Sequence, residues 1–165
     1  MADGKQKPIW YVVGCIGIGL ILVPCVGGVI AAIAIPAFVN FTRRSKTAEA
    51  RANVGAIMAG VEAYCDTEHP GSGPLPRAAG PTLSAPGAER QAQTLGPEWD
   101  DVAFSSADPL YYAYSIERPD ASTAIVVAEG DLDGDGVRSR FAATCTLTPP
   151  SGCSCGEPSV TNELE

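Results

Sequence analysis

The chain contains 165 residues, and its 11 basic and 19 acidic residues give a formal net charge of −8. Nucleic-acid binding requires clustered Lys and Arg, so this balance argues against a nucleic-acid partner. The apolar segment described next takes roughly 40 residues with its flanks, and the remainder suffices for one small domain.

The first third of the chain is predicted to form one continuous helix. Residues 9–41 carry no charged side chain and exceed the length of about 20 residues that a helix needs to cross a bilayer. We therefore expect a transmembrane helix in a lipid bilayer, preceded by a polar cytoplasmic head at residues 1–8. Residues 42–65 continue it as an amphipathic helix, since apolar side chains recur there every three or four positions. These are Val54, Ile57, Met58, Val61 and Tyr64.

Glycine and proline are frequent within the apolar helix. Glycine leaves a small surface that lets another helix approach closely, and proline removes a backbone hydrogen bond and can bend the helix. The alternative is that glycine is simply common in membrane helices. The candidate helix-assembly residues are Gly17, Gly19, Pro24, Gly27, Gly28 and Pro36.

The six cysteines divide between the two parts of the chain, with Cys15 and Cys25 in the apolar segment. Zinc usually takes four Cys or His ligands. The C-terminal cysteines lack Cys-x-x-Cys spacing, and His69 is the one histidine, in a Pro/Gly-rich stretch. We therefore expect disulfides in an oxidising compartment. The candidates are Cys65, Cys145, Cys153 and Cys155.

The disulfide pairing stays open between two arrangements. Cys145 is expected to bond to Cys153 or to Cys155, which closes a short loop, and Cys65 takes whichever remains. Positive residues flank the apolar segment on both sides and leave its orientation ambiguous. The expected disulfides decide it, and the C-terminal domain is predicted to lie outside the cytoplasm on a single-pass membrane anchor.

Residues 66–99 are rich in Pro, Gly, Ala and Ser and show no apolar period, which predicts a long surface loop. Trp99, Val102 and Phe104 are expected to attach the end of this loop to the core.

Residues 100–148 are predicted to form a small antiparallel sheet. Its strands are expected at residues 110–116, 123–127 and 137–147, where β-branched and aromatic residues concentrate between turn residues. Residues 149–165 form a cysteine-containing tail without periodicity. The fold class is therefore α+β, a long N-terminal helix packed on a small antiparallel sheet.

The sequence DLDGDG places Asp131, Asp133 and Asp135 at alternate positions, an opening typical of calcium-binding loops. The glutamate that completes an EF-hand is missing, so a Ca²⁺ site here needs carbonyl, water or distant ligands such as Asp108 or Glu129. The alternative is a solvated hairpin turn, rich in Asp and Gly for conformational reasons. The crowded carboxylates favour a weak Ca²⁺ site that stabilises the turn.

Motifs of catalysis are missing from the sequence: it has no Gly-x-Ser-x-Gly elbow, no phosphate-binding Gly-Lys-Ser/Thr loop and no His-Glu-x-x-His. We assign no catalytic residue and expect a protein that is not an enzyme.

The segment GGVIAAIAIPAFVNFTRRSKTAEARANV resembles the N-terminal helix of type IV pilins and of type II secretion pseudopilins. The resemblance implies the pilin fold and a structural subunit of a type IV pilus, which serves motility and adhesion, or of a secretion pseudopilus. It implies other such subunits as partners of the N-terminal helix, and a prepilin peptidase as its processing enzyme. The matching residues are Ala31, Ala32, Ile33, Ala34, Ile35, Pro36, Phe38, Arg43, Arg44, Lys46 and Ala48.

The resemblance places the cleavage point between Gly14 and Cys15, so the glycine before the cut is present. The basic leader is absent, and Gly19 stands where the family has a glutamate that neutralises a neighbouring N-terminus. The chain is then either an unprocessed membrane-retained protein or a minor subunit that needs no such pairing. Residues 12–15 also form a short lipobox with Cys15 as its lipidated residue, a minor alternative. Outside the filament family, the alternative is an uncleaved, single-pass anchored periplasmic binding domain with a Ca²⁺-stabilised loop.

Overall fold

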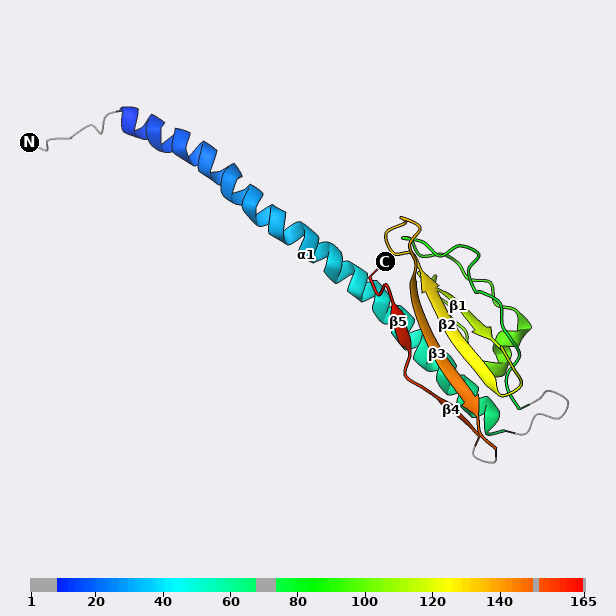
Figure 1. Cartoon of the computed structure of the whole chain (residues 1–165). Helices are drawn as coiled ribbons and strands as arrows, with labels where there is room; N and C mark the ends of the chain where they lie inside the picture. Colours follow the sequence, from blue (N-terminus) through cyan, green and yellow to red (C-terminus); the bar gives the residue numbers. More distant parts are fainter. Residues whose placement is uncertain (1–8, 68–73, 150–151, 165) are drawn as a thin grey trace, which may run out of the picture. The chain divides into compact units, whose positions relative to one another are not determined.

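The computed structural model describes residues 9–67, 74–149 and 152–164, with side chains from Val26 onward (Figure 1). The expected polar head at residues 1–8 and His69 lie outside these ranges. Helix α1 runs from Ile9 to Cys65, and its helical backbone continues through Pro24 and Pro36. The chain divides into two compact units, Met1–Phe41 and Thr42–Glu165.

The second half of α1 buries one stripe of side chains. The buried positions are three or four residues apart, the spacing that places them on one face of a helix. Met58 is half-buried beside them. The amphipathic period predicted from the sequence is thus confirmed. The buried stripe comprises Thr47, Ala50, Val54, Ile57, Val61 and Tyr64.

The sheet contains five antiparallel strands in the order β1-β2-β3-β4, and β5 also pairs with β3 (Figure 1). Inward side chains of the sheet and the stripe of α1 form one hydrophobic cluster. The predicted α+β layout, a long apolar N-terminal helix with a small antiparallel sheet, is confirmed. The strands are β1 Ala113–Glu117, β2 Thr123–Gly130, β3 Ser139–Leu147, β4 Cys153–Cys155 and β5 Ser159–Thr161.

The sheet does not end at residue 148, because the predicted tail contributes β4 and β5 to it. Both strands pair with β3: Cys155 lies opposite Cys145, and Val160 lies opposite Phe141. Neither strand has a buried side chain. Both strands are held by backbone pairing with β3, and β4 is held in addition by two disulfides. Neither kind of contact produces a hydrophobic period in the sequence.

The Pro/Gly-rich loop covers the opposite edge of the sheet, at β1. Ala79 and Ile116 exchange two backbone hydrogen bonds of 3.0 Å, and the Thr82 amide donates to the Tyr114 carbonyl at 2.9 Å. Leu75, Ala79 and Leu83 are buried. A bare strand edge is a template for aggregation, so this part of the loop closes an edge rather than lying free on the surface.

Strand β1 is shorter at its start than predicted, because Leu110 pairs with Gln91 of the loop instead of with β2. The chain enters β1 from a 3₁₀ helix, η1 Pro97–Val102. Trp99, Val102 and Phe104 are 1%, 4% and 8% exposed, which confirms them as the residues that attach the loop to the core.

Candidate functional site

The largest apolar surface in the described residues is the N-terminal part of α1. Ten large hydrophobic side chains are exposed, and eight of them lie between Val26 and Phe41. Val26–Cys65 contains a window with a mean hydropathy of 1.5, none of which is buried. By length and composition this helix is long and apolar enough to cross a membrane.

The candidate assembly and processing residues share this helix. Gly27 and Gly28 have open space where a side chain would begin, and no atom lies within 4 Å of that position. The backbone is also helical at Gly17, Gly19 and Pro24. It is helical at the candidate cleavage residues Gly14 and Cys15 as well. Their processing and their packing against other helices stay predictions.

The three aspartates of the DLDGDG segment gather in the loop between β2 and β3. One carboxylate oxygen of each of Asp131, Asp133 and Asp135 lies within 4.8 Å of the others. Gly134 and Gly136 have φ angles of 79° and 91°, the region that glycine adopts without strain. The three carboxylates therefore cluster in the loop that joins two strands of the sheet. Carboxylate oxygens are ligands of the kind that Ca²⁺ prefers.

Backbone amides of the loop already donate hydrogen bonds to these carboxylates. Asp131 accepts from Gly134 at 2.7 Å and from Gly136 at 3.1 Å, and Asp135 accepts from Val137 at 2.7 Å. This is the self-capping pattern of an Asx-rich turn. The turn is thus well formed by its own hydrogen bonds.

Helix α1 supplies two cations to the same loop, which the sequence analysis did not foresee. Arg43 Nη2 lies 2.6 Å from Asp133 Oδ2, and Lys46 Nζ donates to the Leu132 carbonyl at 3.3 Å. Arg43 therefore supplies part of the positive charge that offsets the repulsion among the three carboxylates. The signal for it was present only as a basic segment following the apolar helix.

The more distant ligands considered for this site lie elsewhere. The described cluster that could hold a metal contains neither Asp108 nor Glu129. Glu129 instead forms ion pairs with Arg138 at 3.1 Å and with Arg140 at 3.6 Å. Its carboxylate is engaged by the neighbouring strand, so any further ligands for a metal have to be carbonyl oxygens or water.

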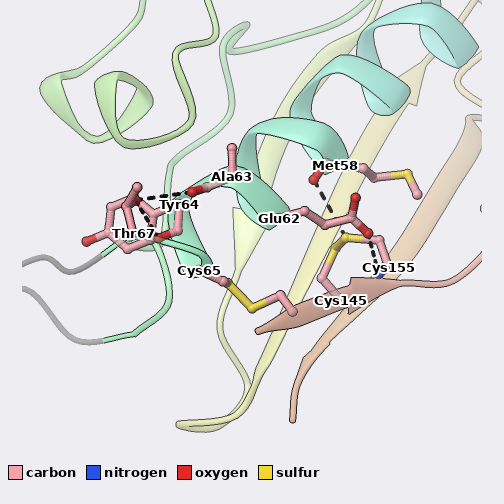
Figure 2. The surroundings of a disulfide bond; sticks show 9 residues. Met58, Glu62, Ala63, Tyr64, Cys65, Thr67, Cys145 and Cys155 are labelled. Atoms are coloured by element: carbon pink, nitrogen blue, oxygen red, sulfur yellow. Dashed lines mark hydrogen bonds between the residues drawn. A yellow bond between two sulfur atoms is a disulfide. The ribbon is translucent and has the colours of Figure 1, made fainter. Parts of the chain in front are cut away.

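Two disulfides hold the C-terminal segment: Cys65–Cys153 joins it to the end of α1, and Cys145–Cys155 joins it to β3. This is one of the two pairings that the sequence left open. Figure 2 shows Cys65 at the end of the helix and Glu62 reaching toward β4, where Glu62 Oε1 accepts a 2.9 Å hydrogen bond from the Cys155 amide. The bridges thus fix β4 to both the helix and the sheet.

Buried phenols connect α1 to the start of the sheet. Tyr114 Oη accepts from Asn53 at 3.0 Å and lies 3.4 Å from Glu49 Oε1. Tyr112 Oη accepts from the Ser139 hydroxyl at 3.0 Å. Burial raises the pKa of both phenols, because the charged form loses its hydration. They hold the core together in their neutral form and open into no described cavity.

No protein-family model, curated protein or solved structure matches this chain.

Proposed function

We propose that this chain is a pilin-like structural subunit, anchored in a membrane, of a type IV pilus or of a type II secretion pseudopilus. One observation carries the proposal: the helical segment from Val26 to Phe41 is exposed and apolar along its length. Such a surface is stable in lipid or against other apolar helices and is costly in water. A subunit that moves from a membrane into a helical bundle needs this surface in both places.

The resemblance of residues 27–54 to pilin and pseudopilin helices supports the same function. In those families the apolar half continues directly into an amphipathic half packed on an antiparallel sheet. Here α1 continues without a break from the apolar segment into the buried stripe. The pilin fold is accordingly the proposed identity of the α+β domain.

The two disulfides support a location of this domain outside the cytoplasm, because disulfides persist in oxidising compartments. The proposed arrangement is a single-pass inner-membrane anchor with the domain in the periplasm or, after assembly, in a surface filament. The partners are then the bilayer, a prepilin peptidase, and the helices of other pilin-like subunits.

Gly19 sets this chain apart from the family pattern. A mature N-terminus at Cys15 would bring an α-amino charge among apolar helices, and a missing carboxylate partner costs several kcal/mol. A minor subunit, placed where no neighbour requires this pairing, avoids that cost. The proposed subunit is therefore a minor one.

The test is the mass and N-terminus of the protein from membranes and from sheared surface material of its native cells. The proposal expects a chain beginning at Cys15, and the substitution Gly14→Val should retain the intact chain. Gly17→Val, the same change three residues further along, should leave cleavage intact. An intact chain in membranes alone would overturn the filament function, and an added diacylglycerol mass would replace it with a lipoprotein.

A second candidate function is a single-pass anchored binding domain with a Ca²⁺-stabilised loop. The clustered oxygens of Asp131, Asp133 and Asp135 favour it. If this second function holds, the protein is an uncleaved, monomeric membrane protein, and its thermal unfolding midpoint rises when Ca²⁺ is added. A cleaved chain recovered in filaments would exclude it.

A further inference from the structure

A cavity of about 150 Å³ lies between α1 and the loops that precede β1. The helix contributes four of its lining residues, spaced so that they share one face. The loops contribute Arg90 and Tyr111. The whole cavity belongs to the unit Thr42–Glu165, and Thr42 directly follows the last residue of the apolar run. The lining residues are Thr42, Ser45, Lys46, Glu49, Arg90 and Tyr111.

Basic side chains in this cavity differ from most others in the protein because no carboxylate pairs with them. Of the nine Arg and Lys residues in the described ranges, five form ion pairs with Asp or Glu. Lys46 and Arg90 are not among those five. The cavity therefore holds two positive charges that form no ion pair with an Asp or Glu of the described residues.

Tyr111 brings these two cations together. Lys46 Nζ lies 4.7 Å and Arg90 Cζ lies 5.0 Å from the centroid of the Tyr111 ring. Because they share one ring, the two charges are no further apart than about 10 Å, one Debye length at 0.1 M salt. The ring attracts each cation, but the cations repel each other, and an anion bound within reach of both would offset that repulsion.

Lys46 retains hydrogen-bonding capacity toward the cavity. Its ammonium donates to the carbonyls of Ala88 at 2.8 Å and Leu132 at 3.3 Å. Lysine has three donors, so a third is left. These two bonds also hold the ammonium in place. Arg90 adds the planar fork of donors that suits phosphate oxygens.

Glu49 is the one acidic residue that lines the cavity, and donors of neighbouring residues surround one of its carboxylate oxygens. Its Oε1 accepts a hydrogen bond of 2.9 Å from the Tyr111 amide and one of 3.4 Å from the Tyr112 amide. Tyr114 Oη lies 3.4 Å from the same oxygen. Several donors on one oxygen disperse its charge, which reduces its repulsion of an anion in the cavity.

We propose that Lys46, Arg90 and Tyr111 form a binding site for a phosphate group. The Ser45 hydroxyl contributes a further donor at the wall. With a volume of about 150 Å³, the cavity is large enough to hold a phosphate group. The phosphate belongs either to an anionic lipid headgroup or to a soluble phosphate.

The test uses full-length, ¹⁵N-labelled protein in maltoside micelles, which contain no phosphate, and follows the Tyr111 amide resonance while inorganic phosphate is added. We expect a saturable shift in the wild type. Removing the Arg90 fork in Arg90→Gln should weaken phosphate binding at least about tenfold. The control Arg138→Gln removes the same charge at a site away from the cavity and should change the affinity less than about twofold.

Nanodiscs distinguish the source of the phosphate. If a lipid headgroup occupies the site, nanodiscs with phosphatidylglycerol shift the Tyr111 resonance without added phosphate, and zwitterionic nanodiscs do not. If a soluble phosphate occupies it, both nanodiscs give the same resonance, and added phosphate shifts it in both. A resonance that responds to neither overturns the proposal, as does an equal loss of affinity in Arg90→Gln and Arg138→Gln.

Discussion

A substitution at Gly60 can test how closely the end of α1 packs against η1. It lies on the side of α1 that faces Val102, and a Cβ added there would collide with the Val102 carbonyl oxygen and lie 3.0 Å from Val102 Cβ. A backbone carbonyl is not a flexible side-chain end, so the substitution Gly60→Ala forces the helix and η1 apart. Gly55 lies on the same helix with no atom within 4 Å of an added Cβ. Gly55→Ala is therefore the matched control.

The two substitutions share one favourable contribution and differ in one cost. Alanine in place of a helical glycine stabilises the helix by up to about 1 kcal/mol. Overpacking costs typically about 1–3 kcal/mol. The free energy of unfolding should therefore rise by up to about 1 kcal/mol in Gly55→Ala, and Gly60→Ala should lie about 1–3 kcal/mol below Gly55→Ala.

The assay is guanidinium unfolding of the full-length protein in maltoside micelles, followed by Trp fluorescence. Trp99 is 1% exposed and lies in η1, so it reports separation of η1 from the core. Equal stabilisation by both substitutions would refute the close contact between Gly60 and Val102. Destabilisation by both would refute the helix-propensity argument on which the comparison depends.

Three further predictions concern the phenols, the disulfides and the acidic loop. Since burial raises the pKa of both Tyr112 and Tyr114, the free energy of unfolding should be level below about pH 9 and fall above about pH 10, where unfolded tyrosine ionises, by up to about 1.4 kcal/mol per pH unit for each phenol. Tyr114→Phe should reduce this fall, and an unchanged slope would contradict the assignment. The Cys65–Cys153 bridge closes a separation of 88 residues, so replacing both cysteines by alanine should cost about 4.6 kcal/mol in guanidinium unfolding; a loss under about 1 kcal/mol would contradict that chain-entropy estimate. Removing the Asp133 ion pair in Arg43→Gln should tighten Ca²⁺ binding several-fold by calorimetry, whereas Arg51→Gln should not, and no heat of binding in any variant would exclude the metal from the loop.

Periodic features were predictable because they repeat along the chain. The stripe from Val54 to Tyr64 follows the helical period over three turns, and its burial follows from sequence alone. Strands β4 and β5 have three residues each, too few to show a period of two. Both strands form because β3 offers an edge for pairing, and β4 is also bonded to Cys65 and Cys145; these partners lie outside the tail.

The surroundings of the acidic loop were unpredictable for a related reason. The carboxylate cluster is local, and its spacing shows directly in the sequence. Its cation, Arg43, is 90 residues away from Asp133 along the chain, and only the packing of α1 beside the β2–β3 loop brings them together. The same holds for the cavity at Tyr111, whose cations come from the helix and from a loop without a period.

Two strand edges of the sheet are already paired within the domain. The edge of β1 is hydrogen-bonded to the loop at Ala79 and Thr82, and the outer edge of β3 is paired with β4 and β5. Ion pairs of Glu129 with Arg138 and Arg140 cover β2 and β3 with charge. Apolar contact is a usual route to stable assembly, and in the described residues the segment from Val26 to Phe41 carries most of the exposed large apolar side chains. In the proposed subunit, this segment is the surface that would contact lipids or the helices of other subunits.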